Sequence, residues 1–183
     1  AFAAGCAVVL KPSELTPLTA LALAYIADQA GIPKGVLNVI TSSDAAAVGQ
    51  ALTRHPQIAK VTFTGSTAVG KLLMRQCADT VKRLSLELGG NAPAIVFADA
   101  DLAVAVQAVM ASKFRNAGQT CVCVNRILVE ESIAAEFSAL LQKAIRQLVT
   151  GPGVTPSVQI GPLINAAAVA KVSQLVNDAV AAG

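Results

Sequence analysis

The stretch KVTFTGSTAVGKLLMRQCA, Lys60 to Ala78, decides the fold class because it holds one complete strand-to-helix unit. Its opening residues are β-branched and aromatic, which is typical of a strand. Gly65 then interrupts the run, and Ser66 is a residue type that often caps the start of a helix. The pattern predicts a strand over residues 60–65 and a helix over residues 66–78.

The same order of elements occurs twice before this stretch. Strands are predicted at residues 7–11 and 35–40, and each is followed by a helical pattern, at residues 16–31 and 44–54. Strands that alternate with helices indicate βαβ units and a parallel sheet. We therefore expect an α/β protein whose first portion contains parallel βαβ units.

The alternation of strands and helices ends at VKRLSLELGGNAPAIVF, residues 81–97, where two strand-like runs are joined by Gly89, Gly90 and Asn91. We place a domain boundary there, between residues 1–88 and residues 89–183. The second portion is predicted to be α/β as well. Its expected elements are a helix from about Asp101, a strand at 125–131, helices at 133–149 and 165–182, and a Gly- and Pro-rich loop at 150–162.

Composition excludes several classes of protein. The chain is 54% hydrophobic and 14% charged, which argues against disorder. No apolar run approaches the roughly 18 residues of a membrane helix. The net charge of +3 is not clustered and aromatic residues are 3%, so nucleic acid is not an expected partner. The four cysteines lack the spacing of a disulfide framework, which favours free thiols in a reducing compartment, the cytoplasm.

Two of those cysteines lie one residue apart in NAGQTCVCVN, residues 116–125. A zinc site needs about four ligands, and the chain has one histidine, so no metal site is expected. A Cys–His pair would need His55, which sits in a polar turn. A carboxylate is the remaining base for a nucleophilic cysteine, and Glu87 ends an apolar strand where burial would raise its pKa toward neutrality. The alternative is that Glu87 pairs with a Lys or Arg in the core.

The segment GSTAVGKL begins like a nucleotide-binding P-loop, but the residue after the lysine is Leu72, where the motif requires Ser or Thr. A nucleoside triphosphatase is therefore not expected. Gly65 and Ser66 at a helix N-terminus can still offer backbone N–H groups to a pyrophosphate. A plain turn with Ser66 as the cap is the alternative.

In VLKPSE the residues Lys11, Ser13 and Glu14 follow the end of a strand, which is where open α/β sheets bind ligands. A carboxylate at this place suits the 2′-hydroxyl of a ribose and would favour NAD over NADP. Lys11 and Ser13 could still bind the 2′-phosphate of NADP, which would allow both cofactors. The alternative is an exposed loop without a ligand.

Together FTGST, LELGGNAP and FRNAGQTC, in this order and spacing, resemble the aldehyde dehydrogenase superfamily over essentially the whole chain. SKFRNAGQTCVC followed by QIGPLIN is similar in particular to its succinate-semialdehyde dehydrogenases. The resemblance implies NAD(P)-dependent oxidation of a small aldehyde, with succinate semialdehyde as the expected substrate, through a cysteine thioester. It also implies that residues 1–88 are the C-terminal part of a Rossmann-like NAD(P)-binding domain and residues 89–183 the N-terminal part of an α/β catalytic domain. For the complete enzyme it implies a homo-oligomer. A non-catalytic α/β binding module that keeps the motifs as scaffold is the alternative.

The resemblance also assigns roles to residues. Cys121 is expected to be the nucleophile and Glu87 the general base, while Arg115 would bind the far carboxylate of the substrate. The cofactor, NAD with NADP as the second choice, would be held by Lys11, Ser13, Glu14, Gly65 and Ser66. For Arg115 the alternative is a structural residue that caps a helix.

Cys123 is expected to be a redox companion that closes a reversible disulfide onto Cys121, unless it is only a small apolar filler. Two family positions do not occur in this sequence: an oxyanion asparagine of a Trp-Asn segment and a ribose-binding glutamate of a Phe-Gly-Pro segment. We therefore do not expect this stretch of chain to turn over substrate by itself.

Overall fold

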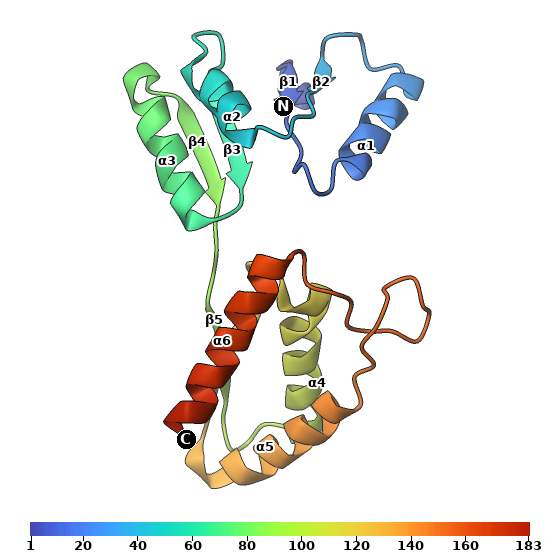
Figure 1. The fold of residues 1–183 in the computed structure, drawn as a ribbon, viewed down its shortest axis with the longest axis vertical. Coiled ribbons are helices and arrows are strands. Elements are labelled where there is room, and N and C mark those ends of the chain that lie inside the picture. Colours follow the sequence, from blue (N-terminus) through green and yellow to red (C-terminus); the bar gives the residue numbers. More distant parts are fainter. The chain divides into compact units, whose positions relative to one another are not determined.

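The computed structural model describes residues 1–183, and the chain divides into two compact units, Ala1–Leu88 and Gly89–Gly183. Figure 1 shows both units as ribbons. The two strand-like runs on either side of Gly89 do not pair with each other. Each pairs with a strand of its own unit. The alternation of strands and helices in the sequence thus ends where the first unit ends and the second begins.

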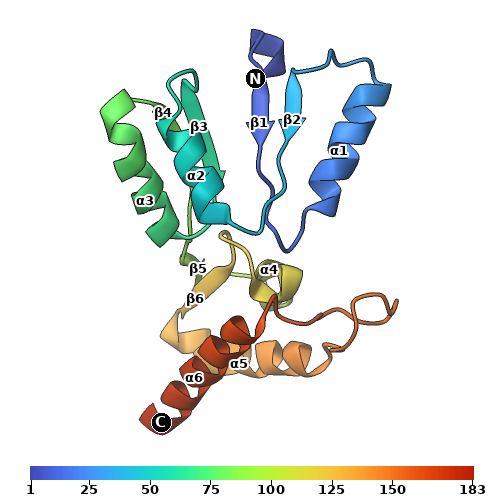
Figure 2. The ribbon, with the colours of Figure 1, turned by 45° about the horizontal axis from the view of Figure 1, so that its top comes forward.

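The first unit begins with a short 3-10 helix (η1, Phe2–Ala4) and a βαβ arrangement. Strand β1 (Val8–Leu10) is followed by α1 (Leu18–Gln29) and by β2 (Leu37–Val39). The two strands are parallel, and α1 packs against β2. Figure 2 shows α1 beside the strand pair. The predicted parallel βαβ arrangement is confirmed here.

The rest of the first unit repeats this plan. Its elements are α2 (Ala45–Arg54), β3 (Lys60–Thr64), α3 (Thr67–Cys77), the short η2 (Ala78–Thr80) and β4 (Arg83–Glu87). Strands β3 and β4 are parallel, and α2 packs against α3. Thr53, which is only 1% exposed, joins the two helices because its hydroxyl hydrogen-bonds Gln76 Oε1 at 3.0 Å.

Buried Lys82 fixes the turn between α2 and β3. Its ammonium group donates to the carbonyls of His55 at 2.6 Å and Ile58 at 2.7 Å. Burial raises the pKa of the nearby Cys77 thiol, and the positive charge of Lys82 opposes that shift. Cys77 is therefore a packed, protonated thiol of the helix pair.

Helix starts follow the capping residues that the sequence indicates. The side chains of Asp44, Ser66, Asp101 and Asn165 each accept a backbone N–H in the first turn of a helix. These helices are α2, α3, α4 (Leu102–Lys113) and α6 (Ala166–Ala182), respectively. Such caps satisfy N–H groups that have no partner within the helix. The helix starts predicted near these residues are confirmed.

The second unit contains β5 (Ala92–Val96), α4 (Leu102–Lys113), η3 (Arg115–Gly118), β6 (Val124–Val129), α5 (Glu131–Arg146) and α6 (Ala166–Ala182). Its core is formed by β5, α4 and α5, where four apolar side chains are buried together: Val96, Val106, Val109 and Phe137. Helix α5 ends three residues earlier than the sequence pattern suggested.

Strands β5 and β6 are parallel, and their register contains a bulge. Ala92 pairs with Val124 and Pro93 with Arg126, so Asn125 is the extra residue of β6. Proline has no N–H to give to a ladder, and it occurs in sheets at edges and bulges. The bulge therefore fits the sequence of β5, and it leaves the Asn125 side chain to make contacts of its own.

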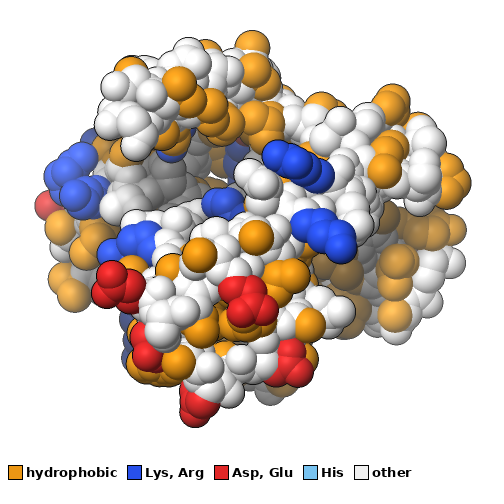
Figure 3. Space-filling model, turned by 90° about the horizontal axis from the view of Figure 1, so that it is seen from below, with side chains coloured by type: hydrophobic (Ala, Val, Ile, Leu, Met, Phe, Trp, Pro, Cys, Tyr) orange, Lys and Arg blue, Asp and Glu red, His pale blue; other side chains and the backbone are white.

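Many apolar side chains are exposed. On α6 they include Val172, Leu175 and Val176, each about half exposed or more. Figure 3 shows apolar side chains interspersed with charged ones on the face seen from below. None of the helices combines the length and the apolar character needed to cross a membrane.

Candidate functional site

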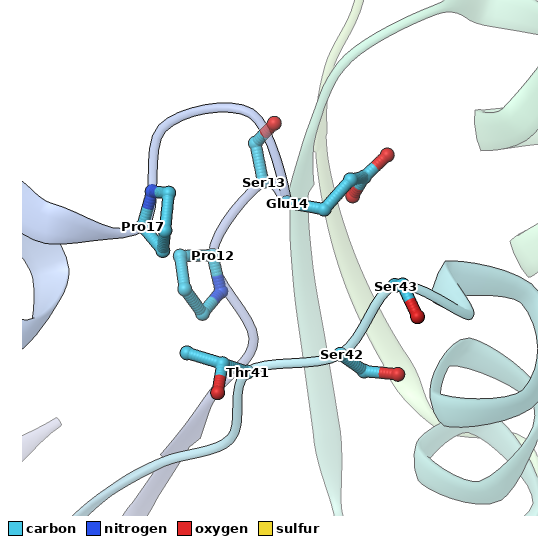
Figure 4. A pocket seen from close by; sticks show the side chains of 7 residues that line it. All are labelled: Pro12, Ser13, Glu14, Pro17, Thr41, Ser42 and Ser43. Carbon is cyan, nitrogen blue, oxygen red and sulfur yellow. The ribbon is translucent and has the colours of Figure 1, made fainter.

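A pocket lies at the carboxyl ends of β1 and β2. Figure 4 shows that its walls come from the segment after β1 and from the segment after β2. Its volume is about 280 Å³, near the lower end of small-molecule pockets, so it suits one part of a larger ligand. The lining residues are Pro12, Ser13, Glu14, Pro17, Thr41, Ser42 and Ser43.

The charges at this pocket are paired. Lys11 Nζ donates to Glu14 Oε2 at 2.8 Å, in the only ion pair of the chain. This hydrogen bond, with the positive charge of Lys11, holds the pKa of the Glu14 carboxyl below its ordinary value. Glu14 is therefore an ionised acceptor at the pocket wall, and Lys11 sets a cation beside it.

Gly65 and Ser66 lie at the start of α3, as predicted. The Ser66 hydroxyl accepts from Val69 N at 3.3 Å, so this side chain is the helix cap. A Cβ atom on Gly65 would lie 2.4 Å from the Phe63 ring, so a larger residue there would require this ring to move. The helix N-terminus carries a partial positive charge and can attract a phosphate.

Glu87 is the last residue of β4, opposite Thr64 in β3. Its carbonyl accepts from Gly65 N at 3.0 Å, so strand pairing places Glu87 beside the start of α3. The expected burial of Glu87 is wrong: both Glu87 and its strand neighbour Thr64 are exposed. The alternative, an ion pair in the core, is not found either, because the only ion pair joins Lys11 to Glu14.

The second unit carries the two neighbouring cysteines on a loop that we call the cysteine loop, Arg115–Cys123. Its backbone is left-handed at Asn116, Ala117 and Gly118, with φ of 51°, 55° and 77°. Asn and Gly tolerate this conformation, whereas for Ala it costs about 1–2 kcal/mol. Such a conformation persists only where surrounding contacts enforce it.

Gly90 holds the cysteine loop from one side. A Cβ atom added to Gly90 would lie 2.3 Å from the carbonyl oxygen of Cys121. Asn125, the bulged residue of β6, links the same places: its Nδ2 donates to Gly90 O at 3.5 Å, and its Oδ1 accepts from Lys113 Nζ at 2.7 Å. The backbone of Cys121 is therefore fixed against a position that only glycine can occupy.

The two cysteines of the loop differ in accessibility. Cys121 is exposed, whereas Cys123 is 1% exposed, and both are free thiols. The Cys123 sulfur hydrogen-bonds Thr120 Oγ1 at 2.8 Å and donates to Lys113 O at 3.7 Å. Cys121 is thus the thiol that a ligand from solvent can reach.

Arg115 follows the end of α4 and is exposed. Its guanidinium makes no hydrogen bond or ion pair within the chain, whereas a residue that caps the helix would bind its last carbonyls. The five N–H donors of Arg115 are therefore available for a carboxylate ligand.

The structure groups the predicted residues within each unit. In the first, Ser13 and Glu14 share one pocket with Lys11 beside Glu14, and Gly65 contacts Glu87. In the second, a single loop carries Arg115, Cys121 and Cys123.

Sequence reasoning missed residues that the structure brings to these places. Thr41 and Ser42 follow β2 as Ser13 follows β1, so the rule that ligands bind at the carboxyl ends of parallel strands would have found them. No local signal singles out Gln119, whose Oε1 accepts from the backbone of Ile164, 45 residues away in the sequence.

Comparison with known proteins shows what this chain is similar to. The family model described as "Aldehyde dehydrogenase family" matches residues 1–183. The mitochondrial succinate-semialdehyde dehydrogenase of Arabidopsis thaliana is 58% identical over 183 residues, 100% of this chain and 34% of that protein. The succinate-semialdehyde dehydrogenase [NADP(+)] GabD of Escherichia coli K12 is 55% identical, over 100% of this chain and 38% of that protein.

Solved structures agree with this result. The crystal structure of succinate-semialdehyde dehydrogenase from Burkholderia pseudomallei superposes with a TM-score of 0.97 at 54% identity, covering 100% of this chain and 38% of that one. The chain thus spans little more than a third of the length of the proteins it matches.

The Gly90 contact leads to a prediction. We expect Gly90→Ala to displace the cysteine loop, because the new methyl group would collide with the Cys121 carbonyl. In the complete protein, the free energy of unfolding measured with urea should fall by about 1–3 kcal/mol, because a methyl group added to a packed site forces the backbone to shift. Gly153→Ala is the matched control, because nothing lies within 4 Å of a Cβ atom there. Equal stabilities of the two variants would contradict the proposed constraint.

Proposed function

Since this chain belongs to the aldehyde dehydrogenase family, we propose that the complete protein oxidises an aldehyde with NAD(P) as the acceptor, and that succinate semialdehyde is its substrate. The observation that carries the proposal is the exposed thiol of Cys121 on a loop whose backbone is fixed by Gly90, next to a buried cysteine. The alternative, a non-catalytic binding module, gains no support from relatives that are named as dehydrogenases.

In the proposed reaction the Cys121 thiolate adds to the aldehyde carbon and forms a thiohemiacetal. The Cys121 N–H, which has no partner within the chain, is oriented by the fixed loop to donate to the developing oxyanion. The bound cofactor supplies the hydride acceptor, which makes the step an oxidation. The covalent product on Cys121 is a thioester.

Hydrolysis of the thioester requires an activated water. We assign this role to Glu87, an exposed carboxylate that is free of ion pairs. Glu87 would take a proton from water as the hydroxide adds to the acyl carbon, and the Cys121 thiolate would leave. The products are a carboxylic acid and the restored nucleophile.

The residues of the first unit fit a dinucleotide. The pocket after β1 and β2 offers hydroxyls and the ionised Glu14 carboxylate, which are suitable acceptors for ribose hydroxyls. The start of α3 offers N–H groups that suit the pyrophosphate. We propose that Lys11, Ser13, Glu14, Gly65 and Ser66 hold NAD or NADP, and that unit 1–88 belongs to the cofactor domain and unit 89–183 to the catalytic domain.

Two further expectations concern the complete protein. We propose that it forms a homo-oligomer, as the family resemblance implies. We also propose that it works in a reducing compartment, because its four cysteines are free. The cytoplasm is the expected location, and the mitochondrial name of the Arabidopsis thaliana relative makes the mitochondrion the other compartment to test.

The first test separates the roles of Cys121 and Glu87. Cys121→Ala in the complete protein should lower kcat by about a thousandfold or more, because the covalent route is lost. Glu87→Gln should lower steady-state kcat by about 10²–10⁴-fold. It should nevertheless keep a rapid burst of NAD(P)H, since hydride transfer precedes hydrolysis.

The exposed Cys6 provides the control, and Cys6→Ala should behave like the parent. Full activity of the Cys121→Ala variant would contradict the proposed function. If the Glu87→Gln variant lacks the burst, Glu87 acts before hydrolysis, which would contradict its role as the base of the hydrolysis step.

The second test concerns the choice between NAD and NADP. The Glu14 carboxylate should repel a 2′-phosphate and favour NAD, and the neighbouring Lys11 should attract that phosphate. We expect higher kcat/KM with NAD for the parent. Glu14→Gln should shift the ratio toward NADP by about tenfold, and Lys11→Met should shift it toward NAD. The control is Glu136→Gln, an exposed carboxylate of α5. If neither pocket variant changes the ratio of kcat/KM with NAD to that with NADP, then Glu14 and Lys11 do not determine the choice of cofactor.

The third test concerns Arg115. Its unpaired guanidinium matches a carboxylate with two parallel hydrogen bonds, so we propose that it binds the far end of succinate semialdehyde. Arg115→Ala should raise KM for succinate semialdehyde by about tenfold or more, and it should change KM for butanal little. Equal losses with the charged and the uncharged aldehyde would indicate a structural role.

The fourth test concerns Cys123. We propose that peroxide oxidises the Cys121 thiolate to a sulfenic acid and that the Cys123 thiol then displaces water to form a disulfide. To do so, Cys123 must leave its contacts with Thr120 and Lys113. We expect the resulting disulfide to be strained and readily reduced, because the two cysteines are only one residue apart.

Peroxide should therefore abolish activity and dithiothreitol should restore it, whereas Cys123→Ala should keep turnover but lose this recovery. If Cys123→Ala recovers as fully as the parent, Cys123 only fills the core.

A further inference from the structure

We infer that Gln119 is a positioning residue, which fixes the cysteine loop to the start of α6 through a hydrogen bond from Ile164 N–H to Gln119 Oε1. This inference rests on the proposed function, because it takes Cys121 as the nucleophile. Gln119 precedes Cys121 by two residues, so a change in its position passes directly to the reactive sulfur.

Both polar ends of the Gln119 side chain are used. Its Oε1 accepts from Ile164 N at 2.8 Å, across 45 residues of sequence. Its Nε2 donates to the carbonyl of Asn116 at 3.3 Å. These two hydrogen bonds hold the amide in one orientation, so we assign Gln119 the role of placing other groups.

The contact with Ile164 is the only hydrogen bond between the cysteine loop and residues 147–183. Ile164 lies immediately before Asn165, whose side chain accepts from Ala168 N at 2.9 Å and caps α6. This hydrogen bond thus gives the cysteine loop a partner at the capped start of the 17-residue helix α6.

The need for such a partner follows from the left-handed backbone of the loop. Ala117 is in a conformation that its side chain disfavours, so the loop would relax if its contacts were removed. The contacts that oppose relaxation converge on Gln119. Its N–H and its Nε2 both donate to Asn116 O, and its own carbonyl accepts from Asn116 Nδ2 at 3.3 Å.

Gly90 and Gln119 therefore act at different points of the loop. Gly90 limits where the Cys121 carbonyl can lie, and Gln119 holds the backbone that precedes it. A loop fixed at both points keeps the thiol in one place while the chemistry proceeds, which is how positioning contributes to rate.

The test uses Gln119→Met in the complete protein, because Met keeps the length of the side chain and removes both hydrogen bonds. We expect kcat with succinate semialdehyde to fall by about tenfold to a hundredfold, with KM changed less than about twofold. The control is Gln142→Met, at an exposed glutamine of α5 whose side chain makes no hydrogen bond. Its kcat and KM should match those of the parent.

A second change separates positioning from simple loss of stability. Adding Ala117→Gly to Gln119→Met should recover kcat by about threefold or more, because glycine adopts the left-handed conformation without strain. Gln119→Glu keeps the oxygen that accepts from Ile164, and between about pH 6 and 9 its highest kcat should exceed that of Gln119→Met. This variant also serves if Gln119→Met does not fold.

The outcomes distinguish this inference from the proposed function. Full activity in Cys121→Ala overturns both. If Cys121 is required but Gln119→Met keeps the parent kcat, or the Ala117→Gly change recovers nothing, or Gln119→Glu is no better than Gln119→Met, then only the positioning role of Gln119 is overturned.

Discussion

Parallel pairing of β5 with β6 is the constraint on which the second unit depends. It places the Gly90–Asn91 segment beside the residues that follow Cys121, and the bulge at Asn125 turns one side chain toward both Gly90 and Lys113. The Cys121 carbonyl then lies where a side chain at Gly90 would collide with it. A feature of backbone hydrogen bonding thus determines where a reactive sulfur is held, since the ladder and the close contact leave the loop little freedom.

The properties of the four cysteines follow from burial more than from sequence spacing. Cys77 and Cys123 are packed, and burial raises the pKa of Cys77, whereas Cys6 and Cys121 are exposed. Exposure alone does not make a nucleophile. Cys121 differs from Cys6 because it follows a strained, left-handed segment whose hydrogen bonds restrict the loop. Restriction of this kind lowers the entropy that a reacting group must lose.

Much of the fold could be predicted from local patterns. The alternation of strand and helix predicted parallel βαβ units, and caps such as Ser66 and Asn165 marked helix starts, because both signals depend on neighbouring residues. The motifs pointed to the family and to the site residues proposed in this work. The exposure of Glu87 and the contact from Gln119 to Ile164 could not be predicted, because both depend on which distant segments pack together. Strand partners also required the structure, since β4 and β5 are neighbours in sequence but pair with β3 and β6.

The most direct test of the central claim is to locate the covalent intermediate. The complete Glu87→Gln protein would be mixed with succinate semialdehyde and NAD(P), quenched in acid and digested with pepsin at low pH, where a thioester is stable and does not exchange with a neighbouring thiol. Cys121 and Cys123 are only one residue apart, so fragmentation in the mass spectrometer must assign the modified sulfur. We predict a succinyl group on Cys121. An unmodified Cys121, or an acyl group on Cys123 in its place, would contradict the account.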